Sequence, residues 1–209
     1  WQYTFGDDIH RKYTDPLIEE DLRTFLAAQY KDKKLTASEM DGIVANLRNT
    51  GGQNDYYAQQ NTFLLYRDGY DFTYSDGRDN PFRLQYIDFE HPDHNIFRCV
   101  NQFVMEQGRE TRRPDILLFV NGIPVCIVEL KNPTKQNATI RDAHTQICTR
   151  YMRDIPALLK YCALAVISDG AKNELGTTYT PFEFFYEWKK IDNEDKASKG
   201  LDTLRTLVR

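Results

Sequence analysis

Two acidic residues and one lysine stand at the margins of the most apolar stretch of the chain. Asp115 directly precedes the apolar run 116–120, and Glu129 and Lys131 close the run 125–128 that follows it. Side chains alternate between the two faces of a strand, so Glu129 and Lys131 share a face. We therefore expect two carboxylates and an amine to converge at one end of a hairpin.

Such a set of groups suits the hydrolysis of phosphodiester bonds. Two carboxylates are hard oxygen ligands for Mg²⁺, which keeps several waters and also binds substrate phosphate oxygens. The metal can activate water and stabilise the charge that builds on the phosphorus and the leaving oxygen. An adjacent lysine can orient the water or hold the scissile phosphate. The alternative to a catalytic role is that Asp115 is an ordinary turn residue and that Glu129 and Lys131 lie on the solvated face of a strand end.

The hairpin that must position these groups is indicated by Asn121-Gly122 between two apolar runs. An Asn-Gly pair in this setting is the strongest short signal for a hairpin turn. Runs that are apolar at consecutive positions predict strands covered on both faces. We therefore expect the two strands of this hairpin to lie in the centre of a sheet.

The register of this hairpin decides whether the acidic residues meet. A strict two-residue turn at Asn121-Gly122 pairs Asp115 with the residue before Glu129, which puts Glu129 on the other face. A shared site therefore requires a three-residue loop or a β-bulge, so that Asp115 lies opposite Glu129. We expect Val120 to pair with Pro124, because proline suits the irregular turn end of a strand better than its interior.

Patterns elsewhere in the chain predict the surrounding elements. Helical periodicity and capping signals predict three helices, near residues 17–26, 36–50 and 138–153. Extended patterns separated by turn residues predict strands at 63–66, 72–74, 82–89, 96–105 and 162–168. We expect the first four of these strands to form an antiparallel meander.

These elements predict an α/β fold with a mixed central sheet flanked by helices. An N-terminal helical and β-hairpin extension precedes the sheet. We expect one domain over residues 1–209, with a helical part at 1–60 and a mixed α/β core at 61–209. The chain begins at Trp1 without the pattern of a signal peptide, so we interpret it as a fragment of a longer protein.

The composition describes a globular chain whose contact with nucleic acid would be local. Its 209 residues are 41% hydrophobic and 28% charged, and the mean hydropathy is −0.63, which excludes disorder and a membrane span. The formal net charge of −4 excludes binding of nucleic acid by overall charge alone. Any nucleic-acid site must therefore be confined to one part of the surface.

The cysteines and histidines carry no evident metal or redox motif. Cys99, Cys126 and Cys162 stand among apolar neighbours, which is typical of buried free thiols in a reducing cytosol. His91 and His94 are close together in a polar loop. Two imidazoles without further ligands do not close a zinc site, so we interpret this pair as part of a solvated loop.

Pro114-Asp115 followed by Glu129-Leu130-Lys131 resembles the PD-(D/E)xK nuclease motif. The wider run 112–133 resembles the N-terminal domain of the restriction (R) subunit of type I restriction-modification enzymes, with further likeness at 100–103, 154–156 and 166–170. The resemblance extends over most of the chain. It implies a PD-(D/E)xK restriction-endonuclease-like core and a Mg²⁺-dependent endonuclease domain that cuts double-stranded DNA. The partners would be methylation and specificity subunits, in the cytoplasm of a bacterium or archaeon.

The resemblance also implies roles for single residues. Asp115 and Glu129 would hold the metal, and Lys131 would act on the water or the phosphate. In this family a Gln-x-x-x-Tyr pattern on the following helix contributes to cleavage and DNA contact. Gln146 and Tyr151 are five residues apart instead of four, which on an ideal α-helix separates them by about 140°. Gln146 is therefore a catalytic candidate, whereas we expect Tyr151 in the core or facing a DNA phosphate.

Arg112 and Arg113 are the basic residues nearest the motif and could contact DNA phosphates.

The motor of this family needs a phosphate-binding loop, and the chain contains no Gly-Lys pair. ATP is therefore expected to bind only the full-length subunit, beyond Arg209. Two alternatives stay open: a non-catalytic docking module of the same complex, and a repair or resolvase-type nuclease on the same fold.

Overall fold

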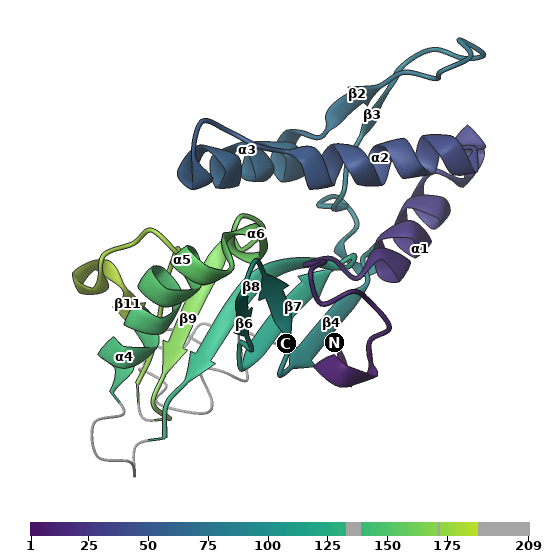
Figure 1. Ribbon diagram of the computed structural model, residues 1–209. Helices are drawn as coiled ribbons and strands as arrows, with labels where there is room; N and C mark the ends of the chain where they lie inside the picture. Colours follow the sequence, from purple (N-terminus) through teal and green to yellow (C-terminus); the bar gives the residue numbers. More distant parts are fainter. Residues whose placement is uncertain (133–138, 171, 188–209) are drawn as a thin grey trace.

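The computed structural model describes residues 1–132, 139–170 and 172–187. Within these residues, the central element is a mixed sheet with the strand order β1-β4-β7-β8-β9-β10-β11 (Figure 1). Its strands are β1 (Gln2–Phe5), β4 (Phe97–Asn101), β7 (Ile116–Val120), β8 (Ile123–Leu130), β9 (Leu164–Ser168), β10 (Asn173–Gly176) and β11 (Tyr186–Glu187). The pairs β1–β4 and β8–β9 are parallel, and the other neighbours are antiparallel. The expected central position of β7 and β8 is confirmed.

Short helices cover one face of this sheet beside β8 and β9 (Figure 1). They are α4 (Ile140–Thr145), the π-helical segment η4 (Gln146–Tyr151), α5 (Met152–Asp154) and α6 (Pro156–Leu159). Together they correspond to the predicted helix near 138–153. Leu117, Phe119 and Ile127 from the sheet pack with Ile147 and Leu158 from this layer in one buried cluster. This cluster is the part of the core that supports the candidate site.

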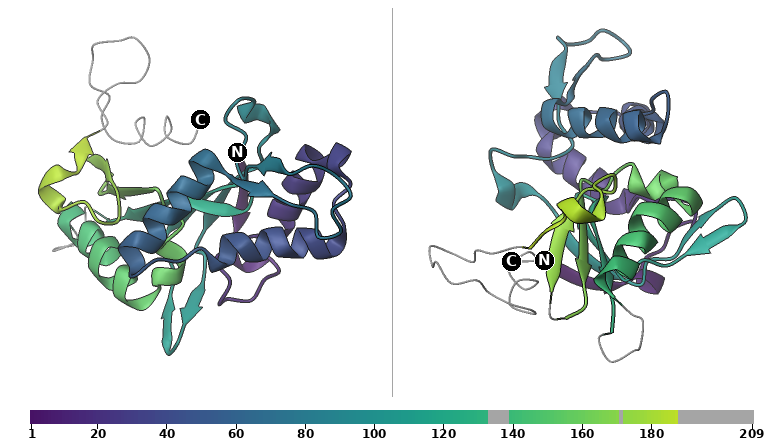
Figure 2. Two further views of the ribbon diagram at one scale, coloured as in Figure 1. Left: turned by 90° about the horizontal axis from the view of Figure 1, so that it is seen from above. Right: turned by 90° about the vertical axis from the view of Figure 1, so that its left-hand side faces the viewer.

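A second group of elements lies at the turn end of the β7–β8 hairpin, above the sheet in Figure 1 and in the right-hand view of Figure 2. It contains α1 (Glu19–Gln29), α2 (Ala37–Asn49), α3 (Asp55–Asp68) and the hairpin of β2 (Tyr70–Phe72) and β3 (Phe82–Leu84). Leu22, Ile43 and Leu84 from this group share a buried cluster with Val120 and Ile123. The predicted capping box at the start of α2 is confirmed.

The remaining elements are short. A small hairpin pairs β5 (Met105–Gln107) with β6 (Glu110–Arg112). The 3-10 helices are η1 (Gly6–Asp8), η2 (Lys31–Lys33), η3 (Pro92–His94) and η5 (Phe182–Phe184). Among the described residues, no helix combines the length and the apolar character needed to cross a membrane.

The segment 63–66, which was expected as a strand, lies within α3. The helix begins where the Asn54 side chain accepts a hydrogen bond of 3.1 Å from a backbone N–H of the first turn. Gln59, Thr62 and Tyr66 follow at helical spacing and are buried on one face. The expected strand was wrong because aromatic residues such as Tyr66 also suit the buried face of a helix.

The predicted antiparallel meander is confirmed for the pair of β2 and β3 and is wrong as a continuous sheet. β2 and β3 pair with each other and are not part of the main sheet. The expected strand 96–105 divides into β4 and β5, because Gln102 between them adopts a φ of 57°. A positive φ is incompatible with a continuous strand.

The β7–β8 hairpin combines a tight turn with a register shift. Asn121 and Gly122 form the turn with φ values of 50° and 75°, and Val120 pairs with Ile123 rather than with Pro124 as expected. The register then shifts between Leu118 and Phe119, so that Ile116 pairs with Val128. The predicted bulge is therefore present, and it brings the positions before Ile116 and after Val128 into register.

Candidate active site

Asp115, Glu129 and Lys131 lie at the open end of the β7–β8 hairpin. Strand alternation puts Asp115 on the same face as Leu117 and puts Glu129 on the same face as Ile127. Both apolar residues belong to the cluster beneath the α4 layer. The Lys131 Nζ donates a hydrogen bond of 2.8 Å to Glu129 Oε1. The structure thus brings the three predicted residues to one face of the sheet.

The carboxylate of Asp115 is held by donors on both of its oxygens. Oδ2 accepts a hydrogen bond of 2.9 Å from the backbone N–H of Leu130, and Oδ1 accepts one of 3.2 Å from Gln102 Nε2. The backbone N–H of Gln102 also donates to the Asp115 carbonyl at 2.9 Å. Sequence reasoning missed this role of Gln102, because the positive φ that turns the residue toward Asp115 has no signature in its residue type.

Gln146 and Tyr151 both reach the same cluster. Lys131 Nζ donates to Gln146 Oε1 at 2.6 Å, and Gln146 Nε2 donates to the Tyr151 hydroxyl at 2.7 Å. The Tyr151 hydroxyl in turn donates to Glu129 Oε2 at 3.3 Å. These hydrogen bonds close a ring of four side chains that links η4 to the end of β8.

The π-helical form of η4 explains how this ring can close. A π-helix bonds residue i to residue i+5, so that residues five apart lie on the same side. The expected separation of about 140° between Gln146 and Tyr151 assumed an α-helix and is wrong for this segment. Tyr151 is only 3% exposed and packs in the core, as expected, while its hydroxyl also reaches the site.

Burial dominates the electrostatics of the cluster. It raises the pKa of Glu129 to about 7, against the opposing effect of the hydrogen bond from Lys131, and the charge of Asp115 raises it further. Burial also raises the pKa of the Tyr151 hydroxyl, which therefore stays a neutral donor. The ionised form of Glu129 is thus disfavoured in the absence of a further cation.

The raised pKa of Glu129 predicts a loss of stability as pH rises from about 4.5 to about 7. The stabilising effect of the protonated carboxyl is complete below the ordinary pKa of 4.5 and is lost as pH rises toward the folded pKa of about 7. We expect the unfolding free energy of the chain in EDTA to fall by on the order of 3 kcal/mol between pH 5 and 8, relative to Glu129→Gln. Urea denaturation of both proteins measures this difference, and parallel pH profiles would contradict it.

Removal of the Tyr151 hydroxyl should weaken the ring without disturbing the core. Tyr151→Phe keeps the buried aromatic side chain but leaves Gln146 Nε2 and Glu129 Oε2 without the hydroxyl as a hydrogen-bond partner. We expect a loss of about 1–2 kcal/mol in unfolding free energy. Tyr186→Phe is the matched control, because Tyr186 is 71% exposed, and its stability should be unchanged. Equal thermal stability of both variants would argue against the ring.

The two arginines before the motif differ in their surroundings. Arg112 Nε donates to Asp154 Oδ2 at 2.7 Å, and its guanidinium also pairs with Glu110 at 2.6 Å. Arg113 is exposed beside it. The guanidinium of Arg112 therefore already has two carboxylate partners, whereas the side chain of Arg113 extends into solvent.

The fold and the cluster define a mixed α/β domain with two carboxylates, a lysine, a glutamine and a tyrosine at the open end of its central hairpin. The family model described as "Type I restriction enzyme R protein N terminus" matches residues 1–184. The chain belongs to this family, and the resemblance drawn from the sequence is confirmed.

Two curated relatives illustrate how far the similarity extends. The type I restriction enzyme HindI endonuclease subunit of Haemophilus influenzae is 30% identical over 220 residues, which cover 100% of this chain and 21% of that protein. The type I restriction enzyme EcoprrI endonuclease subunit of Escherichia coli is 32% identical over 133 residues, which cover 59% of this chain and 40% of the relative. The chain therefore spans about a fifth of the first relative and two fifths of the second.

Proposed function

We propose that this chain is the Mg²⁺-dependent endonuclease domain of a type I restriction enzyme R subunit and hydrolyses phosphodiester bonds of double-stranded DNA. The proposal includes a PD-(D/E)xK restriction-endonuclease-like core. Its main support is that Asp115, Glu129 and Lys131 share one face at the open end of a central hairpin, through a bulge that shifts the register. A docking module in which the hairpin is only core would need neither the bulge nor the shared face.

The donor set fits Mg²⁺ at Asp115 and Glu129. Carboxylate oxygens are the ligands that this ion prefers, and it needs only one or two of them besides water and phosphate oxygens. Two carboxylates share the cluster with a single amine, and burial raises the pKa of Glu129 to about 7, so a bound cation would favour its ionised form. When bound, Mg²⁺ would activate a water and stabilise charge on the phosphorus and the leaving oxygen.

The residues of the chain would orient the reacting groups. The Lys131 ammonium has three N–H donors, of which one contacts Glu129 and one contacts Gln146. Its third N–H could hold the attacking water or a phosphate oxygen. Gln146 would fix the position of the ammonium, and Tyr151 would fix Gln146 and Glu129 in turn. Both would thus act as positioning residues.

The larger assembly is part of the same proposal. Arg113, and Arg112 after exchange of its carboxylate partners, would contact DNA phosphates near the cleavage site. Methylation and specificity subunits would be the protein partners. ATP would serve only the full-length subunit, and the complex would work in the cytoplasm of a bacterium or archaeon.

Metal binding and cleavage together test the proposed function. Crystals soaked in Mn²⁺ should show an anomalous peak bounded by Asp115 and Glu129. The complex that contains the full-length subunit should cut double-stranded DNA with Mg²⁺ and should lose cutting in EDTA. A peak elsewhere, or undiminished cutting in EDTA, would overturn the proposal. Parallel assays on linear, nicked and branched DNA would distinguish a restriction nuclease from a repair or resolvase-type enzyme.

A further inference from the structure

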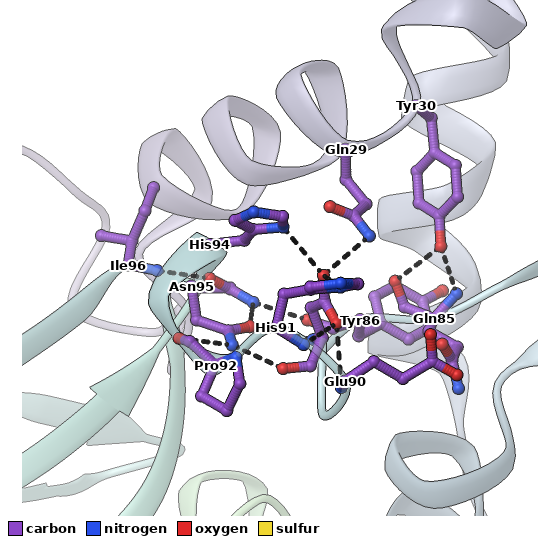
Figure 3. A network of polar contacts seen from close by, with 12 residues as sticks. Gln29, Tyr30, Gln85, Tyr86, Glu90, His91, Pro92, His94, Asn95 and Ile96 are labelled. Carbon is purple, nitrogen blue, oxygen red and sulfur yellow. Dashed lines mark hydrogen bonds and ion pairs between the residues drawn. The ribbon is translucent and has the colours of Figure 1, made fainter.

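A second group of possible metal ligands lies in the loop between β3 and β4. Figure 3 shows Gln29, His91, His94 and Asn95 among the residues of this polar network. Asp88, which contacts all four of them, is only 6% exposed. Its Oδ1 accepts hydrogen bonds from the backbone N–H groups of Glu90 and His91 at 3.0 and 2.8 Å. Its Oδ2 accepts a hydrogen bond of 3.1 Å from Gln29 Nε2, which comes from α1. The carboxylate is therefore fixed between the loop and the first helix.

Two imidazoles converge on the same carboxylate oxygen. Nδ1 of His94 lies 3.1 Å from Asp88 Oδ2, and Nδ1 of His91 lies 3.6 Å from it. The rings stack with centroids 4.9 Å apart, and both side chains are more than half exposed. The distance of 3.1 Å from His94 is that of a hydrogen bond, whereas the distance of 3.6 Å from His91 is too long for one. The position of the His91 imidazole beside this oxygen therefore needs another explanation.

The distances from Asp88 Oδ2 to the two imidazoles are close to those between two ligands of a tetrahedral ion. Two ligand atoms bound to Zn²⁺ at about 2.0–2.1 Å lie roughly 3.3–3.4 Å from each other. The observed separations of 3.1 and 3.6 Å at Asp88 Oδ2 bracket this value, and ligand atoms of all three residues lie within 4.8 Å of one another. Exposure of the two imidazoles leaves the fourth position accessible to water. Such sets of two imidazoles and one carboxylate suit Zn²⁺ far better than Mg²⁺.

The loop that carries these ligands is held in place by buried amides. Asn95 Oδ1 accepts a hydrogen bond of 2.9 Å from the Asp88 backbone N–H, and Asn95 Nδ2 donates to the carbonyls of Asp88 and Pro92 at 2.7 and 3.0 Å. Asn121, in the β7–β8 turn, donates to Asn95 Oδ1 at 2.8 Å. The backbone that carries Asp88, His91 and His94 is thus held in place before any ion binds, which is how supporting residues act in metal sites.

We propose that Asp88, His91 and His94 form a Zn²⁺ site that fastens the β3–β4 loop to α1 and to the turn of the central hairpin. The sequence alone offered only two imidazoles, and the fold supplies the third ligand. The site lies at the turn end of the hairpin, roughly 17 Å along β7 from the proposed Mg²⁺ ligands at its open end. It is therefore independent of the proposed nuclease chemistry.

Calorimetric titration with Zn²⁺ in excess Mg²⁺ tests this site. We expect one Zn²⁺ per chain with a micromolar or lower Kd, and at least a tenfold weaker affinity in His91→Ala and in His94→Ala. His10→Ala is the matched control, because His10 is an exposed histidine outside the loop, and it should bind as the unsubstituted chain does. Asp115→Ala should also bind normally, which separates this site from the proposed nuclease site.

A second measurement guards against loss of folding in the histidine variants. Zn²⁺ should raise the Tm of the unsubstituted chain by several degrees and leave the Tm of His91→Ala unchanged, while the Tm values without metal stay alike. Absence of micromolar binding would overturn the proposal. Binding that survives both histidine substitutions, or that is lost in His10→Ala or Asp115→Ala, would overturn it equally.

Discussion

Asp115→Ala and Lys131→Ala should each lower DNA cleavage by the full-length R subunit in its complex by roughly 10³-fold or more. Asp115→Ala removes one of two proposed metal ligands. Lys131→Ala removes the amine that would hold the water or phosphate. ATP-driven translocation should continue in both variants, because the chain carries no phosphate-binding loop of its own. Cleavage of covalently closed DNA and a translocation assay on the same preparations measure the two activities separately.

The substitutions need controls for folding, because Glu129 is buried beside both residues. Asp115→Asn keeps an acceptor for the Leu130 N–H, and Lys131→Gln keeps a donor for Glu129. These variants should fold and still fail to cut. Exposed residues of the same types in η2 provide matched controls, with normal cutting expected in Lys31→Ala and Asp32→Ala. Cutting at the normal rate by folded Asp115→Asn would remove this residue from the proposed mechanism.

Gly122→Ala should destabilise the fold strongly at the opposite end of the same hairpin. The residue has a φ of 75°, and an added Cβ would overlap the carbonyl oxygen of Ile18. The Ile18 N–H donates a hydrogen bond of 2.9 Å to the Gly122 carbonyl. The two segments therefore cannot move apart to make room for the Cβ without breaking this hydrogen bond. We expect a decrease of roughly 3 kcal/mol or more in unfolding free energy.

Gly77→Ala separates the cost of the left-handed backbone from the cost of the overlap with Ile18. Gly77 has a similar φ of 65°, but an added Cβ there would meet no atom within 4 Å. The variant should therefore lose only the cost of the left-handed backbone, about 1 kcal/mol. Urea denaturation of both variants gives the difference directly. Similar losses at the two positions would mean that the close approach of the turn to Ile18 does not matter.

The sequence predicted the central part of the fold well because its signals there are local. Asn121-Gly122 between two apolar runs indicated the β7–β8 hairpin, and the capping box at Thr36 indicated α2. The segment 63–66 misled because aromatic residues suit both a strand and a buried helix face. The cap at Asn54, together with packing, decided for a helix.

The candidate site divides in the same way. The motif at Asp115, Glu129 and Lys131 was readable from residue types and strand alternation, and the requirement for a bulge followed from counting residues. The hydrogen-bonded ring that includes Gln146 and Tyr151 could not be predicted from the sequence. Residues five apart lie on different sides of an α-helix but on the same side of a π-helix. Local sequence does not distinguish these two forms when tertiary contacts supply the deciding hydrogen bonds.

By itself, the sequence determined which groups this domain has for chemistry and on which hairpin they lie. Hydrophobic periodicity and turn residues act over a few positions, so they can be read without knowledge of the fold. The tertiary structure alone decided which groups of separate segments meet, such as Gln102 with Asp115 and Gln29 with Asp88. These meetings depend on backbone dihedral angles and on packing between segments far apart in the chain, which residue types do not specify.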